Sequence, residues 1–331
     1  MLERLAVPLV QAPMAGGPST PQLTAAVANA GGLGFAAAGY RTPEAFAADL
    51  AATRALTDGP IGANLFAPAG AAADPSVVAA YAERLAPEAA RAGVELGTPR
   101  FDDDAFDAKL AVLAQHPVHV VSFAFALPPP HAVAAVHASG AEVWVTVTHP
   151  GEARLAVAAG ADALVVQGVE AGGHRGSFDD GPADIALLAL LQLVRAAVDV
   201  PLVATGGLAT AAAVAAVLAA GAAAAQAGTA FLLCPEAGTA RALRDAVAAP
   251  GRTALTRAFT GRLARGIENR LLREHSAAAP SAYPELHHLT APLRAHGRAA
   301  GDADLINLWA GQAHELARPV PAAEVVRALA P

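Results

Sequence analysis

The sequence has a single cysteine, Cys234, so it cannot form an intramolecular disulfide framework. A chain without paired cysteines is typical of a reducing compartment, and we expect this protein to be cytoplasmic. Cys234 follows the apolar residues 231–233, which favours an inert, buried thiol over a nucleophile. The scarcity of cysteine therefore excludes small disulfide-stabilised folds and gives no support to thiol chemistry.

Charge and long apolar segments are also scarce. Only 15% of the 331 residues are charged, and the formal net charge of −7 lacks the basic excess that nucleic-acid binding requires. No basic segment followed by an apolar one opens the chain, and the alanine-rich segment 209–225 is interrupted by Gly221 and too short to cross a membrane. We therefore expect a soluble protein whose partners are small molecules, as a monomer or a homodimer.

Hydrophobic residues make up 54% of the chain, enough to bury the core of one large domain. Short apolar runs alternate with alanine-rich amphipathic segments, which predicts strand–helix units and a parallel sheet. About eight such units in roughly 240 residues indicate a (β/α)8 TIM-type barrel, with a doubly wound sheet as the alternative because periodicity does not show closure. The expected strands are Ala6–Gln11, Gly34–Ala38, Ile61–Phe66, Val118–Phe123, Glu142–Val147, Ala163–Gln167, Pro201–Thr205 and Ala223–Gly228. The expected helices are Pro21–Ala30, Pro43–Ala55, Pro75–Ala90, Asp104–Gln115, Pro130–Ala138, Gly151–Ala159, Ile185–Val198, Ala209–Ala220 and Gly238–Ala248.

The pattern changes after about residue 250. No further parallel strand is evident there, Arg, His, Pro and Tyr become more frequent, and Leu286, Leu289 and Leu293 recur at helical spacing. We therefore assign residues 1–250 to the barrel and residues 251–331 to a smaller, mainly helical cap near the barrel mouth. The last helix either stays with the cap or packs back on the barrel.

The carboxyl ends of the strands in such a barrel form its active site, and several of them carry polar or glycine-rich segments. The most informative is Gly-Gly-His-Arg-Gly, residues 172–176, which follows an apolar run that ends at Gln167. Glycine there allows a ligand to approach the backbone closely, and His174 is able to exchange a proton near neutral pH. Met14 and Asn64 lie near the ends of two other expected strands. A solvent-exposed loop histidine is the alternative for His174.

Two glycine-rich turns follow the last two expected strands, Gly206-Gly207 and residues 226–229. Free backbone N–H groups in the loops after strands seven and eight form the common phosphate site of these barrels. The sequence has no Gly-x-Ser-x-Gly pattern, and the adjacent His287 and His288 have no carboxylate at ligand spacing, so we expect no metal. A phosphorylated cofactor therefore has to supply the reactivity.

Together these segments resemble the nitronate monooxygenase family, FMN-dependent (β/α)8 enzymes that oxidise alkyl nitronates with molecular oxygen. The similarity covers nearly the whole chain and includes Gln11–Gly17, Ala30–Gly34, Gly62–Phe66, Val121–Pro128, Gly160–Gly176, Ala204–Leu208, Gln226–Phe231, Phe259–Asn269 and Tyr283–Leu293. The resemblance implies oxidation of nitronates, and of nitroalkanes, by O2 to a carbonyl compound and nitrite. It implies that His174 is the catalytic residue and that Arg175 and Tyr283 contact the substrate. The implied FMN contacts are Met14, Asn64, Gln167, Gly172, Gly206, Gly207, Gln226, Ala227, Gly228 and Thr229.

Two features depart from the family. Ala124 stands where many members have a histidine, and the chain has only three tyrosines, whereas family pockets are often tyrosine-rich. Both departures put the identity of the substrate in question more than the binding of the flavin. One alternative is an FMN-dependent enoyl-acyl-carrier-protein reductase. Such reductases resemble this chain in the segment Glu-Ala-Gly-Gly-His but have Ile where this chain has Arg175. A second alternative is a flavin-binding protein without catalytic activity. The absence of a Gly-x-Gly-x-x-Gly run at the start of a helix argues against a dinucleotide-binding dehydrogenase.

Overall fold

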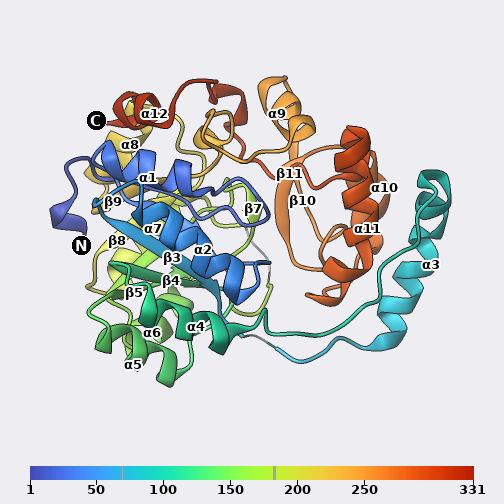
Figure 1. Ribbon diagram of the computed structural model, residues 1–331, viewed down its shortest axis with the longest axis horizontal. Helices are drawn as coiled ribbons and strands as arrows, with labels where there is room; N and C mark the ends of the chain where they lie inside the picture. Colours follow the sequence, from blue (N-terminus) through green and yellow to red (C-terminus); the bar gives the residue numbers. More distant parts are fainter. Residues whose placement is uncertain (69, 182–183) are drawn as a thin grey trace.

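The strands that follow the predicted pattern form one closed parallel sheet (Figure 1). In the computed structural model, which describes residues 1–68, 70–181 and 184–331, they are β1 (Leu9–Gln11), β2 (Gly34–Ala37), β3 (Ile61–Phe66), β4 (Val120–Ala124), β5 (Glu142–Val147), β6 (Ala163–Gln167), β8 (Leu202–Thr205) and β9 (Ala224–Ala227). Their order is β1-β9-β8-β6-β5-β4-β3-β2. The edge strands meet at a bridge between Val10 and Leu33, where the Leu33 N–H donates to the Leu9 carbonyl at 3.0 Å. This closure confirms the predicted (β/α)8 barrel over the doubly wound alternative.

Helices alternate with the strands and surround the barrel. They are α1 (Pro21–Asn29), α2 (Pro43–Arg54), α4 (Phe106–Gln115), α5 (Pro130–Ala138), α6 (Pro150–Ala158), α7 (Leu187–Ala197), α8 (Ala211–Ala219) and α12 (Ala322–Leu329). Several begin at a proline, whose fixed φ suits the first helical position. The C-terminal helix α12 packs against α1 and α8, so it completes the ring of helices next to β9 (Figure 1). The last helix therefore packs back on the barrel, one of the two positions that the sequence left open.

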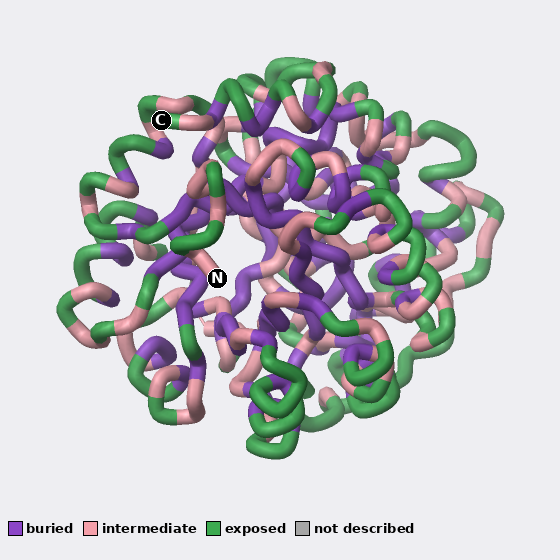
Figure 2. Tube along the Cα trace, turned by 60° about the vertical axis from the view of Figure 1, so that its left-hand side comes forward, coloured by how far each residue is buried: buried purple, intermediate pink, exposed green. Residues whose placement is uncertain are grey.

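The interior of the barrel is apolar and filled. Phe35 and Trp144 are fully buried there with ring centroids 6.0 Å apart, and Val10 and Leu33 belong to the same cluster. Leu2 of the N-terminal 3-10 helix η1 (Leu2–Arg4) and the flanking residues Met1 and Leu5 pack against this cluster. Buried segments accordingly run through the centre of the molecule, with exposed segments outside (Figure 2). The carboxyl ends of the strands are the end left available for a site.

A second lobe lies beside the barrel and contains β10 (Thr253–Thr256), β11 (Ala264–Ile267), α10 (Arg270–His275) and α11 (Glu285–Ala300) (Figure 1). β10 and β11 form an antiparallel hairpin, and β11 also pairs with β7 (Gly173–His174), with Ala264 opposite His174. The sequence predicts a mainly helical region here and misses this hairpin. The strands are short, and β11 (Ala-Arg-Gly-Ile) lacks an alternating pattern, so pairing with β7 and not local sequence determines the strand conformation.

The second lobe is surrounded by segments from both sides of residue 250. The helix α3 (Pro75–Ala92), from the long excursion after β3, packs against α11, and α9 (Arg241–Ala248) lies next to the lobe (Figure 1). The division of the chain at residue 250 thus stays a prediction about sequence organisation. None of the helices in the described ranges is long and apolar enough to cross a membrane.

Candidate active site

A cavity of about 570 Å³ opens where the carboxyl ends of the barrel strands meet the second lobe. Its wall includes His174 and every residue that the sequence assigns to cofactor binding: Met14, Asn64, Gln167, Gly172, Gly206, Gly207, Gln226, Ala227, Gly228 and Thr229. These residues come from the ends of β1, β3, β6, β8 and β9 and from the loops that follow. The structure brings them together in space; their roles in binding and catalysis stay predictions.

One corner of the cavity is rich in unpaired backbone N–H groups. The amides of Gly206, Gly207, Gly228 and Thr229 donate to no acceptor among the residues that the structure describes. Gly206 and Gly207 have φ values of 125° and 69°, which only glycine adopts readily. The Gln226 side chain, largely buried, also forms no hydrogen bond within the described part of the chain. Convergent free donors of this kind suit a phosphate group, and we call these five residues the phosphate corner.

Two amide side chains, of the buried Asn64 and the half-buried Gln167, shape the neighbouring wall. Asn64 Nδ2 donates to the carbonyl of Ser122 at 3.1 Å and to its Oγ at 2.9 Å. Gln167 Nε2 donates to the His174 carbonyl at 3.0 Å, while Gln167 Oε1 accepts from the Gly176 N–H at 2.8 Å. Because Gln167 uses both ends of its amide in this way, it fixes the loop that carries His174.

His174 is the histidine of this loop, and it stands among aromatic rings. Its Nε2 lies 2.8 Å from Thr260 Oγ1, and its ring centroid lies 5.7 Å from that of Phe125 and 5.5 Å from that of Trp309. Burial lowers the pKa of His174 from 6.5 to about 3, and the positive charges of Arg262 and Arg294 add to the effect. The imidazole is therefore neutral at pH 7, the protonation state that a general base needs, and its catalytic role stays a prediction.

Arg175 does not line the cavity, which corrects its assignment to substrate contact. Its side chain is fully buried, and its Nη2 donates to the Gln167 carbonyl at 2.7 Å while its Nη1 donates to the Gly168 carbonyl. Successive side chains along an extended segment point to opposite sides, so His174 and Arg175 cannot both face the cavity. Arg175 instead ties the glycine-rich loop to the end of β6.

Tyr283 lies one layer behind the cavity wall. Its hydroxyl donates to the Tyr40 hydroxyl at 3.2 Å, and its ring centroid is 5.9 Å from that of His174. It lines a second cavity, of about 880 Å³, whose wall shares Tyr40, Phe125 and His287 with the first. A substrate contact by Tyr283 stays a prediction.

Several cavity residues escaped the sequence analysis. Phe125 comes directly after β4 and Tyr40 lies in the short loop after β2, with positive φ values of 82° and 65°. The strand-end argument alone could therefore have found both residues. His287 and Arg294 come from α11, and Trp309 from the segment that follows it. No local pattern marks these three, because they reach the cavity only through the packing of the second lobe.

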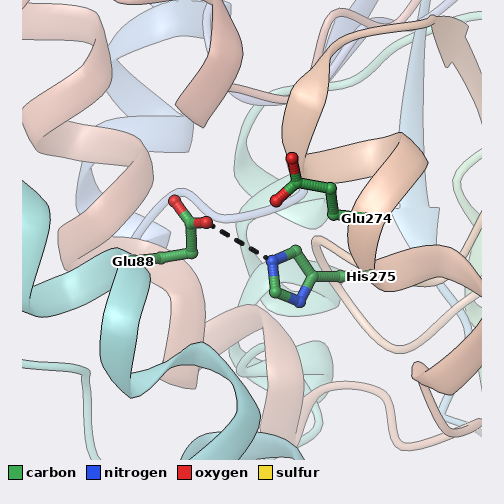
Figure 3. Close-up of side chains that lie close together, drawn as sticks. All are labelled: Glu88, Glu274 and His275. Carbon is green, nitrogen blue, oxygen red and sulfur yellow. Dashed lines mark ion pairs between the residues drawn. The ribbon is translucent and has the colours of Figure 1, made fainter.

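A separate cluster of polar side chains lies between α3 and α10 (Figure 3). Among the described residues, Glu88, Glu274 and His275 hold metal-ligating atoms within 4.8 Å of one another. Both Glu88 oxygens, however, accept hydrogen bonds from guanidinium groups, at 2.6 Å from Arg270 and 2.8 Å from Arg91. A divalent cation would have to displace these charges, so the cluster is better described as an ion-pair network that joins the two helices.

Comparisons with known proteins agree with this geometry. A sequence model of nitronate monooxygenases matches residues 1–331. A nitronate monooxygenase from Pseudomonas aeruginosa is 42% identical, over 97% of this chain and 95% of its own. The solved structure of a nitroalkane oxidase from Streptomyces ansochromogenes superposes with a TM-score of 0.96 at 51% identity, covering 99% of this chain and 96% of that one. FabK from Thermotoga maritima superposes with a TM-score of 0.78 at 24% identity over 99% and 93% of the two chains, which shows a common fold alone.

Proposed function

The chain belongs to the nitronate monooxygenase family, and on this premise we propose that it binds FMN and oxidises alkyl nitronates with O2 to a carbonyl compound and nitrite. Membership in the family places the protein among flavin-dependent oxidoreductases of nitronates or nitroalkanes. The observation that carries the finer proposal is the presence, in one cavity, of the phosphate corner and of His174.

The residues of the cavity fit FMN. The free N–H groups of Gly206, Gly207, Gly228 and Thr229, with the Gln226 side chain, would hold its single phosphate, and Asn64 offers a polar group to the rest of the cofactor. Side chains at Gly206 and Gly207 would strain the backbone, because the φ values there are positive. A single phosphate corner supports FMN over FAD, whose second phosphate and adenosine need further contacts. FMN, when bound, would supply the electron acceptor for the nitronate.

His174 would act on the proton of the substrate. A neutral nitroalkane must lose its α-proton before oxidation, and His174 would accept it. Burial and two guanidinium groups oppose a positive charge on this imidazole, as its pKa of about 3 indicates. A preformed nitronate has already lost the proton and avoids this cost. The electrostatics of the site therefore favour the nitronate anion over the neutral nitroalkane as substrate.

The test is an aerobic assay without pyridine nucleotide. Flavin released from the purified protein by heat should chromatograph as FMN. The protein should then release nitrite and consume oxygen when a nitronate is added in the absence of NAD(P)H. Rapid anaerobic bleaching of the flavin by NAD(P)H, with no response to any nitronate, would instead favour the enoyl-acyl-carrier-protein reductase alternative. A protein that cannot be reconstituted with FMN would refute the proposal.

A further inference from the structure

Arg294 is a buried cation on the cavity wall. It comes from α11, is only 5% exposed, and donates from Nε to Thr290 Oγ1 at 3.0 Å and from Nη2 to the His287 carbonyl at 2.7 Å. Its Nη2 also lies 3.2 Å from His287 Nδ1, which must then be the accepting, unprotonated nitrogen. Nη1 forms no hydrogen bond to residues 1–68, 70–181 or 184–331. The Nη1 end of the Arg294 guanidinium therefore has N–H groups that are free to donate to a ligand.

This charge also has no carboxylate partner in the described part of the chain, in contrast to the other arginines that form ion pairs. Burial lowers the pKa of Arg294 only to about 10, so it stays charged at pH 7. Arg262, also buried, donates to the carbonyls of Arg175 and Ser177 and lies 4.2 Å from the centroid of the Phe125 ring. A buried cation without a counter-ion is costly, and an anion in the cavity would compensate Arg294.

The position of Arg294 identifies the end of the cavity at which this anion would bind. Arg294 is hydrogen-bonded to His287, whose ring stacks on Tyr40 at 4.1 Å, and all three line the same cavity as His174. The phosphate corner is formed by other residues, at the ends of β8 and β9. The cavity thus offers separate places for two negatively charged groups, one among backbone amides and one beside His174.

We propose that Arg294 binds the oxygen atoms of the nitronate and makes the site selective for anionic over neutral nitro compounds. This inference rests on the proposed function, because it names the residue that would hold the substrate of that reaction. A planar guanidinium with free N–H groups matches the planar, negatively charged O–N–O group of a nitronate. The neighbouring histidines contribute no charge, because His174 and His287 have pKa values of about 3 and about 2.

Nitrate is a suitable probe of this site, since it is a planar anion that is not oxidised. Titration of the purified holoenzyme with sodium nitrate, against sodium chloride at equal ionic strength, should change the visible spectrum of the flavin saturably and compete with the nitronate. Calorimetry gives the same dissociation constant without relying on the flavin. Failure of nitrate to bind the wild-type protein would overturn the proposal whatever the variants do.

Three variants separate charge recognition from structure. Arg294→Gln should raise the Kd of nitrate and the KM of the nitronate about 10- to 100-fold, the loss expected for one charge-assisted hydrogen bond. The KM of neutral nitroethane should change much less, and Arg294→Lys should recover part of the nitronate affinity because it keeps the charge. Arg273→Gln, which removes an exposed charge from α10, should leave all three quantities unchanged.

The outcomes distinguish this proposal from the proposed function. Equal losses for nitronate and nitroethane, without recovery in Arg294→Lys, would show that Arg294 only supports the fold. An unchanged nitrate Kd in Arg294→Gln would show that the anion binds elsewhere. If nitrate binds through Arg294 but the wild-type protein oxidises no nitronate, the anion site stands and the proposed reaction is refuted.

Discussion

The lowered pKa of His174 predicts a large difference between two forms of one substrate. A neutral nitroalkane requires a proton to move onto an imidazole whose pKa is about 3 instead of 6.5. That difference corresponds to about 5 kcal/mol against the charged imidazole. The negative charge of the newly formed nitronate would stabilise the protonated imidazole and so offset part of this free-energy cost. We therefore expect kcat/KM for the nitroalkane to lie about 10²- to 10³-fold below that for its nitronate.

Removal of the imidazole tests its role directly. His174→Ala should lower nitroalkane turnover by a further 10²- to 10⁴-fold, the usual contribution of a general base, and nitronate turnover by about tenfold or less. Nitrite release and oxygen uptake measure both activities, with freshly prepared nitronate and with the nitroalkane at the same pH. The ratio of flavin to protein shows whether the variant keeps its cofactor. His131→Ala, which removes an exposed histidine from α5, is the matched control.

Two results would refute this reasoning. Equal turnover of nitroalkane and nitronate by the wild-type protein would show that the buried imidazole accepts a proton without penalty. Equal losses on both substrates in His174→Ala would show that His174 positions the substrate or the flavin and is not the base.

Three further predictions concern the cofactor and the stability of the fold. Gly172→Ala places a methyl group against the backbone of Ala310, so it should lower flavin content and the urea midpoint together. Glu88→Gln leaves guanidinium groups between α3 and α10 without their carboxylate, and urea unfolding should show a loss of about 2 kcal/mol or more. Burial lowers the pKa of His174 to about 3 and that of His287 to about 2, so below pH 6.5 the unfolded chain binds more protons than the folded one. The free energy of unfolding should therefore fall as the pH is lowered from 6.5 towards 3, and His287→Gln should make this fall less steep.

The barrel was predictable because its signals are local. Each strand is a short apolar run, and helices such as α1 and α2 begin with a threonine cap followed by proline. The bounds of β3, β5, β6 and α5 match the predicted ones. The gathering of the expected cofactor residues in one cavity is explained in the same way, since parallel strands of a barrel bring their carboxyl ends together whatever lies between them in sequence.

The remaining features depend on contacts that sequence patterns do not show. The hairpin β10–β11 exists through its pairing with β7, and the direction of the Arg175 side chain depends on the extended conformation of that same segment. Arg294 and His287 lie on α11, which packs against α3 and against the 3-10 helix η4 (Ala303–Leu305). A motif search can place such residues on a helix, but it cannot say which cavity that helix faces.

The cavity is built by two parts of the chain with different constraints. The phosphate corner belongs to the barrel loops, and the positive φ values of Gly206 and Gly207 would strain any other residue at these two positions. Side chains of the second lobe form the end beside His174, and their charge and shape can change without altering any barrel strand. Ala124 also lines the cavity and contributes no charge. The residue that recognises the anion, Arg294, therefore lies on α11, which packs against α3. Substitutions in α3 should for this reason change the preference between nitronate and nitroalkane more than they change the affinity for flavin.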